Sequence, residues 1–550
     1  MYCTECGAQY NQGERFCAAC GATMEAPAPE PPAADETNGE YGEADRAAYG
    51  EGAYGVRKGR RSLAKLLIGL GGAAVLVLLA VILTNVIRGG GRFGTYSDDA
   101  LLFVHMDDGA LQVLSDGQAV ATLDGIGSIS YSMDRSVLTV IDEDNTLYTL
   151  TKSGASRVAD DVKAAAISQD GSHVAFLSDY DKDTYTGTLY LHTVGGESEK
   201  IADDVIVEPV VLSPNGQSVA YETLIDDQEM DGYIYTKGGE LEKLGRNCMV
   251  LALADKSRYI YYLKVDFDAG SCSFYVDKGG EQVKLASDIY DLGGCFNRDL
   301  SEVLYRHDDK IYISRAGGDK ERVAGDAYGC YLAIPRNGAR YSSYNEFSVF
   351  AVYDVDTLAG SVFSNGDSFY YLGKDLESEK IIADGYGATV SEDGKSLLYY
   401  SSNRIYRIED LTRDATKEAI ASGIGSYYLV SASSDLSVLA YVDKDEAIYY
   451  KKGDNDPVRI GYDGESLLLT ESGKVLYYIS DGILYVSKNG AKGSSVSGGQ
   501  NVVSILQSGD SVYYTCDSES YADCYDLYYA ALGDTAFTLV AKGVQYAYTY

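Results

Sequence analysis

Residues 391–408 read SEDGKSLLYYSSNRIYRI, and this phrase decides the fold because it recurs through most of the chain. It contains a Ser-Glu-Asp-Gly turn, a short strand that reaches Tyr399, and a second strand that carries the apolar-Tyr pair Ile405-Tyr406. Ten copies of the phrase cover residues 137–529. Their apolar-Tyr pairs are Leu147-Tyr148, Leu189-Tyr190, Ile234-Tyr235, Phe274-Tyr275, Ile311-Tyr312, Phe369-Tyr370, Ile405-Tyr406, Ile448-Tyr449, Leu484-Tyr485 and Leu527-Tyr528.

The spacing of the copies indicates the architecture. The last residues of the ten turns, which serve as anchors, are Arg135, Gly171, Gly216, Lys256, Leu300, Gly338, Gly394, Leu436, Gly473 and Gly509. Their mean spacing is about 42 residues, which suits one four-stranded blade of a β-propeller. Aromatic and β-branched residues in short runs, flanked by Asp-Gly or Asn-Gly turns, favour strands over helices. We predict a mainly β fold of about ten four-stranded blades, as one large propeller or two in tandem. The wide interval from Gly338 to Gly394 predicts an insertion, where two propellers would join.

Five positions after the anchor, the residue is aromatic in eight of the ten copies. These residues are Phe176, Tyr221, Tyr261, Tyr305, Tyr399, Tyr441, Tyr478 and Tyr514. An aromatic residue at a constant position of a strand predicts packing between sheets, and the composition of 50 Tyr, 12 Phe and no Trp agrees with such a role. The alternative is an aromatic platform for a sugar or peptide. Tyr371, Tyr427 and Tyr428 are the better candidates for it because they stand outside the repeated positions.

The turn Ser213-Pro214-Asn215-Gly216, together with the apolar-Tyr strand that follows it, resembles the TolB-type propeller repeats of bacteria, which are similar to WD40-like repeats. The proline is missing from most other copies. The resemblance implies a β-propeller, in agreement with the period.

The amino-terminal segment, residues 1–24, carries two matched cysteine pairs, Cys3-Thr-Glu-Cys6-Gly and Cys17-Ala-Ala-Cys20-Gly. Two Cys-x-x-Cys turns can surround one zinc ion tetrahedrally, and a site closed by four thiolates is structural. Two disulfides or an iron centre of the rubredoxin type are the alternatives. The segment resembles the short zinc ribbons at the start of many bacterial membrane proteins, so zinc is the predicted cofactor. The zinc-ribbon segment would serve either as a small docking site for another protein or only as a folded cap at the amino terminus.

Residues 25–65 form an acidic linker, rich in Pro, Ala, Glu and Gly and predicted to be disordered, that ends in a basic juxtamembrane stretch. Residues 66–87 then run for 22 positions without a charge, which is long enough for one transmembrane helix. Five basic residues precede this span and two follow it, so the amino terminus is predicted to be cytoplasmic and residues 93–550 extracytoplasmic. The predicted helix also has a small-residue face, Gly69, Gly71 and Gly72, that would suit helix pairing.

Charge and cysteine content constrain the portion after residue 92. It has 37 basic and 72 acidic residues, a net charge of about −35, which disfavours nucleic-acid binding and suits cations, basic polymers or plain solubility. Cys516 and Cys524 are spaced for a cross-strand disulfide. The pairing of Cys248, Cys272, Cys295 and Cys330 does not follow from sequence, and free thiols are an alternative for all six cysteines. Asp179, Asp181 and Asp183 alternate as in a calcium loop but lack its Gly and Glu.

No catalytic motif is present in the sequence. Its four histidines, His105, His173, His192 and His307, have no spacing typical of a metal triad, and neither a Gly-x-Ser-x-Gly elbow nor a phosphate-binding loop occurs. We therefore expect no enzyme but a single-pass membrane protein that displays its propeller as a binding, scaffold or sensing module. The expected partners are a protein or envelope polymer on the propeller and a cytosolic protein on the zinc ribbon. The alternative is a propeller-type hydrolase or lyase acting on an extracellular glycan.

Overall fold

The computed structural model describes residues 101–549 apart from 208–209, 227–228, 240, 290–291, 326–328, 335–339, 346–347, 366–367, 413–414, 499 and 522. The chain divides into two units, Met1–Arg60 and Arg61–Tyr550, and all described residues belong to the second. The predicted zinc ribbon, linker and membrane span lie outside the described residues. Within the described ranges, the structure contains no helix long and apolar enough to cross a membrane.

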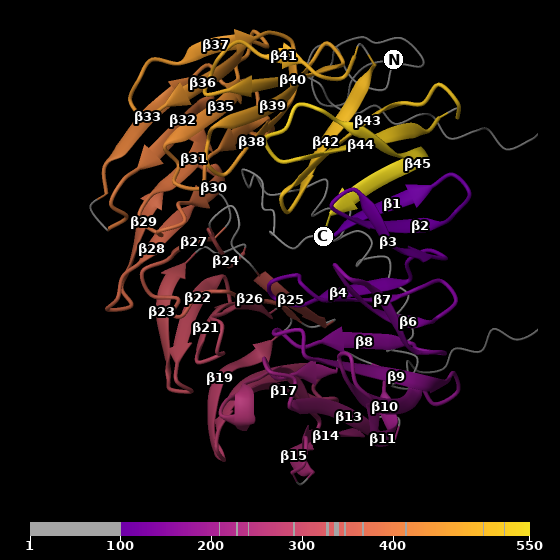
Figure 1. Ribbon diagram of the computed structural model, residues 1–550. Coiled ribbons are helices and arrows are strands. Elements are labelled where there is room, and N and C mark those ends of the chain that lie inside the picture. Colours follow the sequence, from indigo (N-terminus) through magenta and orange to yellow (C-terminus); the bar gives the residue numbers. More distant parts are fainter. Residues whose placement is uncertain are drawn as a thin grey trace, which may run out of the picture. The chain divides into compact units, whose positions relative to one another are not determined.

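The described chain is built almost entirely of β-strands in four-stranded antiparallel sheets consistent with propeller blades. In each sheet the strands follow chain order, and we name them A to D from the inside of the circle outward (Figure 1). Sheet 1 contains β1 (Leu102–Met106), β2 (Leu111–Ser115) and β3 (Gln118–Leu123) as strands B to D. Sheet 2 contains β4 (Ser128–Tyr131), β5 (Leu138–Ile141), β6 (Leu147–Thr151) and β7 (Gly154–Ala159). Sheet 3 contains β8 (Ala164–Ile167), β9 (His173–Asp181), β10 (Thr186–Thr193) and β11 (Ser198–Ile206). Sheet 4 contains β12 (Val211–Leu212), β13 (Ser218–Asp226), β14 (Glu229–Thr236) and β15 (Glu242–Arg246).

Sheets 5 to 8 continue the same order. They are β16 (Cys248–Leu253), β17 (Ile260–Asp266), β18 (Ser271–Lys278), β19 (Glu281–Ile289); β20 (Leu292–Phe296), β21 (Glu302–His307), β22 (Lys310–Arg315), β23 (Lys320–Gly325); β24 (Tyr331–Leu332), β27 (Val362–Ser364), β28 (Phe369–Leu372), β29 (Ser378–Ile382); and β30 (Tyr386–Val390), β31 (Leu397–Ser401), β32 (Arg404–Ile408), β33 (Lys417–Ser422). A hairpin of β25 (Arg340–Asn345) and β26 (Ser348–Tyr353) is inserted in sheet 7 between β24 and β27.

Sheets 9 to 11 complete the described chain. They are β34 (Val430–Ala432), β35 (Val438–Val442), β36 (Ile448–Lys452), β37 (Val458–Gly461); β38 (Gly464–Leu469), β39 (Val475–Ser480), β40 (Ile483–Lys488), β41 (Ser494–Ser495); and β42 (Val502–Ser508), β43 (Ser511–Asp517), β44 (Tyr525–Ala531), β45 (Thr538–Thr549). The two short 3-10 helices among the described residues are η1 (Asp255–Ser257) and η2 (Tyr427–Leu429).

The last strand joins the end of the described chain to its beginning. The first half of β45 pairs with β44 up to Val544, and its second half pairs with β1 from Val544 to Thr549. β45 therefore serves as strand D of sheet 11 and as strand A of sheet 1. The described sheets follow one another in a closed cycle, with the yellow last sheet beside the indigo first one (Figure 1).

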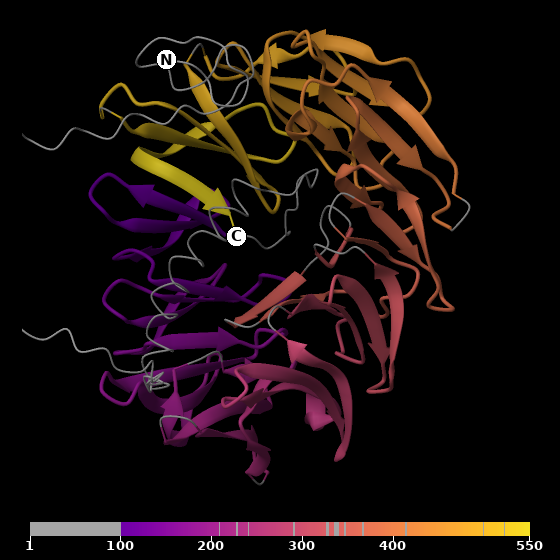
Figure 2. The same cartoon turned by 180° about the vertical axis from the view of Figure 1, so that it is seen from behind.

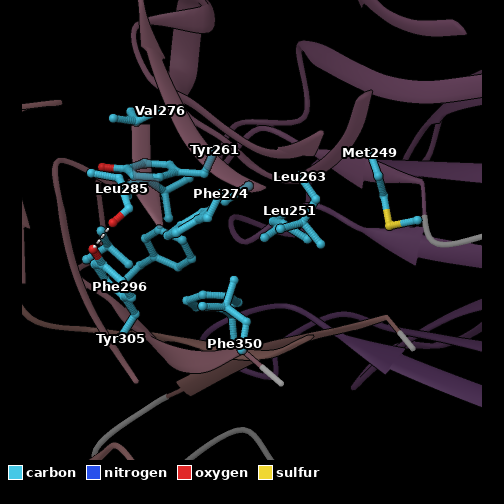
Figure 3. Close-up of a cluster of buried hydrophobic side chains, with 14 of the residues drawn as sticks. Met249, Leu251, Tyr261, Leu263, Phe274, Val276, Leu285, Phe296, Tyr305 and Phe350 are labelled. Atoms are coloured by element: carbon cyan, nitrogen blue, oxygen red, sulfur yellow. Dashed lines mark hydrogen bonds between the residues drawn. The ribbon is translucent and has the colours of Figure 1, made fainter. Parts of the chain in front are cut away.

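A buried hydrophobic cluster spans every junction between consecutive sheets, including the junction of sheet 11 with sheet 1. The cluster between sheets 5 and 6 is rich in aromatic rings (Figure 3). In it, Phe296 and Phe350 lie 4.9 Å apart between ring centroids, and Tyr261 meets Phe296 edge-on at 4.8 Å. The core of the propeller is thus divided among the junctions, as expected when each sheet buries both of its faces against its neighbours.

The anchor turns have one recurring geometry, which explains their Ser-x-Asp-Gly sequence. In sheet 8, the Ser391 hydroxyl donates to Asp393 Oδ1 at 2.7 Å, and Asp393 Oδ1 also accepts from Lys395 N at 3.1 Å. The hydrogen bonds between the first and third turn residues are Ser132–Asp134, Ser168–Asp170, Ser213–Asn215, Asn297–Asp299, Ser391–Asp393, Ser433–Asp435 and Thr470–Ser472. Every described anchor has a positive φ, 71° at Gly394 for example, which glycine adopts without steric cost.

The repeated aromatic residues pack between sheets, as predicted. All eight aromatic residues at the fifth position after the anchor are buried. Most of them face an aromatic residue directly across the strand pair. These stacked pairs include Phe176–Tyr190, Tyr305–Tyr312, Tyr399–Tyr406, Tyr441–Tyr449, Tyr478–Tyr485 and Tyr514–Tyr528, with centroid separations from 4.8 to 5.7 Å. Such cross-strand pairs stabilise the sheets beyond the area that they bury.

The structure differs from the sequence-based prediction in the number of sheets and in the place of a join. Among the described residues, the ten predicted repeats are sheets 2 to 11, and sheet 1, which shares β45 with sheet 11, adds an eleventh. Sheet 1 escaped the repeat pattern because Gln112 replaces its Tyr and because its strand A comes from the far end of the chain. The predicted insertion is the β25–β26 hairpin, which lies on the inner side of sheet 6, where β26 pairs in parallel with β20 (Figures 1 and 2). It does not mark a join between two propellers, because one buried cluster continues from sheet 6 to sheet 7.

Candidate functional site

The predicted zinc ligands Cys3, Cys6, Cys17 and Cys20 lie outside the described residues. The six other cysteines are buried free thiols. The spacing of Cys516 and Cys524 therefore does not produce a disulfide here. Cys516 instead lies opposite Asp526, and its thiol donates to the carbonyl of that residue at 3.8 Å. Burial, together with the nearby Asp526 and Asp517 carboxylates, raises the pKa of Cys516 to about 11, which favours the protonated thiol over the thiolate at neutral pH.

The aspartates that alternate as in a calcium loop do not form a cation site. Asp181 Oδ1 accepts a hydrogen bond from Asp183 N at 2.8 Å, and this bond lowers the pKa of Asp181. The carboxylate thus stabilises its own turn. Across the described ranges, no group of three or more His, Cys, Asp or Glu side chains has an arrangement that would hold a metal ion.

The four histidines also pack against residues of their own or adjacent sheets. His173 and His192 lie near the junction of sheets 3 and 4, and burial lowers the pKa of both imidazoles. His307 Nε2 lies 2.9 Å from the carbonyl oxygen of Ser287. His105 stacks on Tyr546 at the closure, and burial lowers its pKa too. Ser172 Oγ lies 2.8 Å from His173 Nδ1 and donates to Asp170 Oδ1 at 2.6 Å. Asp170 Oδ1 also accepts from Ser172 N at 2.9 Å, so this carboxylate stabilises the anchor turn of sheet 3.

The exposed tyrosines have a common location. In an antiparallel sheet, the B–C connection lies at the same end as the connection from strand D to strand A of the next sheet. We call this end of the sheets the BC end. The opposite end, with the A–B and C–D connections, is the AB end. Within the described residues, six tyrosines are exposed, and all lie at the BC end: Tyr331, Tyr386, Tyr428, Tyr462, Tyr521 and Tyr546. Four of them occupy the same place in sheets 7 to 10, at or just before the start of strand A.

The densest part of this set lies where sheet 8 meets sheet 9. Tyr427 stacks on Tyr386 at a centroid separation of 6.3 Å, and it contacts Tyr428 at 4.0 Å and Tyr400 at 5.8 Å. Tyr386 and Tyr428 remain 47% and 60% exposed. Burial and a hydrogen bond to Tyr428 raise the pKa of Tyr427. We call these four residues, Tyr386, Tyr400, Tyr427 and Tyr428, the tyrosine cluster.

Hydrogen bonds hold the tyrosine cluster in place. The Tyr400 hydroxyl donates to Asn403 Oδ1 at 2.8 Å, and Ile424 N donates to the Asn403 carbonyl at 3.1 Å. The Ser426 hydroxyl accepts from Tyr428 N at the start of η2. The B–C turn of sheet 8 is thereby tied to the segment that carries Tyr427 and Tyr428, so the cluster is a preformed surface.

Acidic turns flank the tyrosine cluster. Residues 443–446 form the B–C turn of sheet 9, and Lys444 N donates to the Gly423 carbonyl at 2.7 Å. At the other end of the same turn, the Glu446 carbonyl accepts a hydrogen bond from Gly464 N at 3.1 Å. Tyr462 and Asp463 directly precede Gly464 in the chain. Aromatic and acidic segments therefore alternate along the BC end of sheets 8 to 10.

Of the three tyrosines that the sequence marked as platform candidates, the structure brings two together. Tyr427 and Tyr428 belong to the tyrosine cluster, whereas Tyr371 lies in β28 and packs partly buried against the junction of sheets 7 and 8. Sequence reasoning missed Tyr386, Tyr400 and Tyr462. Their position just before or at the ends of strands A and B was the available signal, but it needed the strand boundaries.

Comparison with solved structures finds distant similarity only. An eukaryotic initiation factor matches with a TM-score of 0.33 and 9% identity over 82% of this chain and 98% of that chain. TolB from Acinetobacter baumannii matches with a TM-score of 0.28 and 15% identity over 41% of this chain and 63% of its own. The tricorn protease matches with a TM-score of 0.26 and 12% identity over 75% of this chain and 58% of its own. The propeller assignment accordingly stands on the sheets described above.

The amino-terminal segment has a family match. No curated protein matches the chain, but residues 2–24 match the zinc-ribbon domain family. The four thiolates of Cys3, Cys6, Cys17 and Cys20 are the donor set that a structural zinc ion requires. The chain thus carries an amino-terminal zinc-ribbon domain ahead of its propeller-like sheets.

Proposed function

We propose that this protein is a single-pass membrane protein that displays residues 93–550 outside the cytoplasm as a binding module. In this proposal, residues 66–87 are the membrane span and the zinc ribbon stays in the cytoplasm. The distribution of Lys and Arg around the span supports this orientation. The six free cysteines of the propeller are buried, which is compatible with an oxidising compartment because buried thiols are protected from reaction.

The observation that carries the binding role is the tyrosine cluster. Tyrosines of the repeat are buried between sheets, whereas Tyr386 and Tyr428 expose about half of their surface beside one another. A contiguous exposed aromatic surface, held by hydrogen bonds at one end of a rigid ring of sheets, is typical of a ligand-binding site. The partner would be a protein or an envelope polymer. The alternative function is that of a propeller-type hydrolase or lyase acting on an extracellular glycan.

Photocrosslinking in intact cells tests the binding role. The photoreactive residue p-benzoylphenylalanine is placed at position 428 of the full chain, or at position 492 as a control. Lys492 is exposed in a C–D connection of sheet 10, at the AB end. We expect a discrete crosslinked adduct from position 428 and none from position 492. Equal adducts, or none from either position, would contradict the binding role.

Labelling with a membrane-impermeant maleimide tests the orientation. Ala536→Cys introduces an exposed thiol in the last C–D connection, and Thr37→Cys introduces one in the linker. We expect the thiol at position 536 to react in intact cells and the thiol at position 37 to react only after permeabilisation. The reverse pattern would place the propeller in the cytoplasm.

A further inference from the structure

The tyrosine cluster offers ring faces that no described Lys or Arg side chain occupies. Elsewhere the chain repeatedly places a Lys or Arg over a tyrosine, as with Lys320 over Tyr312 at 4.8 Å and Arg459 over Tyr462 at 4.5 Å. Among the described residues, no Lys or Arg lies over Tyr386, Tyr427 or Tyr428. The cluster is therefore an electron-rich aromatic surface open to a cation from outside.

Carboxylates stand beside these rings without basic partners. Asp384 precedes Tyr386 by two residues, Asp445 and Glu446 lie in the turn tied to Gly423, and Asp463 follows Tyr462. All four side chains are exposed, and none takes part in an ion pair with another described residue. In the connections at the BC end of sheets 8 to 10, Lys444 is the basic residue of the described chain, and two arginines of adjacent strands lie nearby: Arg404 begins β32, and Arg459 covers the ring of Tyr462.

The combination of open tyrosine faces with unpaired carboxylates selects for positive charge. A neutral glycan would use the rings but not the charges, and an anionic polymer would be repelled by them. An extended chain with Lys or Arg side chains would use both, because each cation can lie over a ring while it pairs with a neighbouring carboxylate. The alternation of aromatic and acidic segments along sheets 8 to 10 suits a polypeptide segment that carries several cations.

We propose that the BC end of sheets 8 to 10 binds a Lys- and Arg-rich segment of a partner protein. Tyr386, Tyr427 and Tyr428 receive the cationic side chains, and Asp445, Glu446 and Asp463 pair with them. This inference rests on the proposed binding function and specifies the partner class for the same site.

The test measures binding of a fluorescent Arg-rich oligopeptide to the full-length chain in detergent micelles, by anisotropy. The variants are Tyr428→Ala and the double variant Asp445→Asn with Glu446→Gln. Each variant has a matched control. Tyr521→Ala removes another exposed tyrosine of the BC end, and Asp456→Asn with Asp534→Asn neutralises two exposed carboxylates at the AB end.

The dissociation constant is expected to rise about tenfold in each site variant and less than about twofold in each control. Lys444→Gln removes the cation of the turn that carries Asp445 and Glu446 and is expected to tighten binding about threefold. Binding is also expected to weaken when salt is raised from about 0.05 M to about 0.5 M, because exposed charges are screened. Site and control variants that weaken binding equally would show a diffuse acidic surface and overturn the inference.

Two competition arms separate this inference from the proposed function. In the first arm, a neutral N-acetylglucosamine oligomer is added. If the oligomer displaces the peptide, or if it binds the chain by itself and this binding is lost in Tyr428→Ala, the ligand is a glycan and the cationic partner is rejected. If the photoreactive residue at position 428 forms an adduct in cells but excess Arg-rich peptide does not prevent it, the binding function stands and its assignment to a cationic segment fails. If the peptide prevents the adduct, both are supported.

Discussion

His105 of β1 stacks on Tyr546 of β45, with ring centroids 4.2 Å apart and ring planes 20° apart. The two residues also lie opposite one another in the strand pairing. This contact joins the two ends of the described chain, because β1 is its first strand and β45 its last. The strand pairing that closes the cycle is thus made by only the second half of one strand, and the hydrophobic cluster between sheets 11 and 1 supports it.

Removal of residues 545–550 is expected to open the ring of sheets. The deletion leaves β1 as an unpaired edge and uncovers Leu102 and Val104, which are fully buried in the cluster between sheets 11 and 1. We expect the free energy of unfolding to fall by about 3–5 kcal/mol, measured by urea denaturation followed by circular dichroism. Tyr546→Phe, which keeps the ring, is the control. A deletion as stable as this control would show that the closure contributes little.

Two glycine substitutions separate backbone strain from packing between sheets. Gly394 and Gly473 have φ of 71° and 68°, so alanine costs about 1 kcal/mol at either position through its left-handed conformation. A Cβ at Gly394 meets no atom within 4 Å, whereas a Cβ at Gly473 lies 2.6 Å from Val438 Cγ2. We expect Gly473→Ala to be less stable than Gly394→Ala by about 1–3 kcal/mol in urea denaturation. Equal losses of stability in the two variants would mean that the neighbouring sheet shifts to accommodate the added Cβ at little cost.

The Tyr305 hydroxyl satisfies a backbone carbonyl of the preceding sheet. The pairing of β18 with β19 shifts register beside Leu285, and the Tyr305 hydroxyl donates to the Leu285 carbonyl at 3.0 Å (Figure 3). Tyr305→Phe is expected to destabilise by about 1–2 kcal/mol because this buried carbonyl loses a partner. In Tyr399→Phe, the deleted hydroxyl makes no hydrogen bond to the described residues, and the expected loss is below about 0.5 kcal/mol. A Tyr305→Phe variant no less stable than Tyr399→Phe would refute the assigned role.

Acid titration tests the anchor turn of sheet 8. Hydrogen bonds from the Ser391 hydroxyl and then from Lys395 N lower the pKa of Asp393 to about 2. Because the folded pKa lies below the unfolded value of about 3.9, the ionised carboxylate stabilises the fold above about pH 4, and this contribution is lost as the pH falls towards 2. In Asp393→Asn, we expect the part of the acid sensitivity that comes from this turn to disappear. NMR titration of the Asp393 carboxyl carbon checks the pKa directly, and a midpoint near 4 would contradict it.

Zinc content tests the amino-terminal site. The purified full chain is expected to contain one zinc ion, and Cys6→Ser is expected to reduce the bound zinc by about tenfold or more because a three-thiolate site holds the ion more weakly. Cys516→Ala is the control, since this buried thiol lies in the propeller. Elemental analysis by mass spectrometry measures the ratio. Retention of zinc in Cys6→Ser would exclude the four-cysteine site.

The repeated apolar-Tyr pair marks a register shift between strands C and D that is visible only in the folded structure. In most sheets the pairing of strands C and D shifts register between these two residues, as at Ile405/Tyr406 and Ile448/Tyr449. The bulge on strand D leaves a carbonyl for the next sheet, and Tyr478 donates to such a carbonyl, that of Ile460, at 3.4 Å. At Tyr305 and Tyr478 the ring packs between sheets and the hydroxyl binds such a carbonyl, a second role that Phe could not fill. The pattern predicted strands but gave no sign of the bulge, because a bulge is a property of two paired strands.

The sequence by itself determined the strands, the turns and the packing role of the repeated aromatics, because these depend on residues within one period of about 42 positions. It likewise determined the zinc-ribbon segment, whose ligand spacing is local. Only the tertiary structure decided that β45 supplies strand A of the first sheet, that Gln112 belongs to a further sheet, and that Tyr386, Tyr400, Tyr427 and Tyr428 meet on one surface. These relationships join residues from different strands and different sheets. The contacts do not follow from spacing along the chain, because they form only when neighbouring sheets pack against one another.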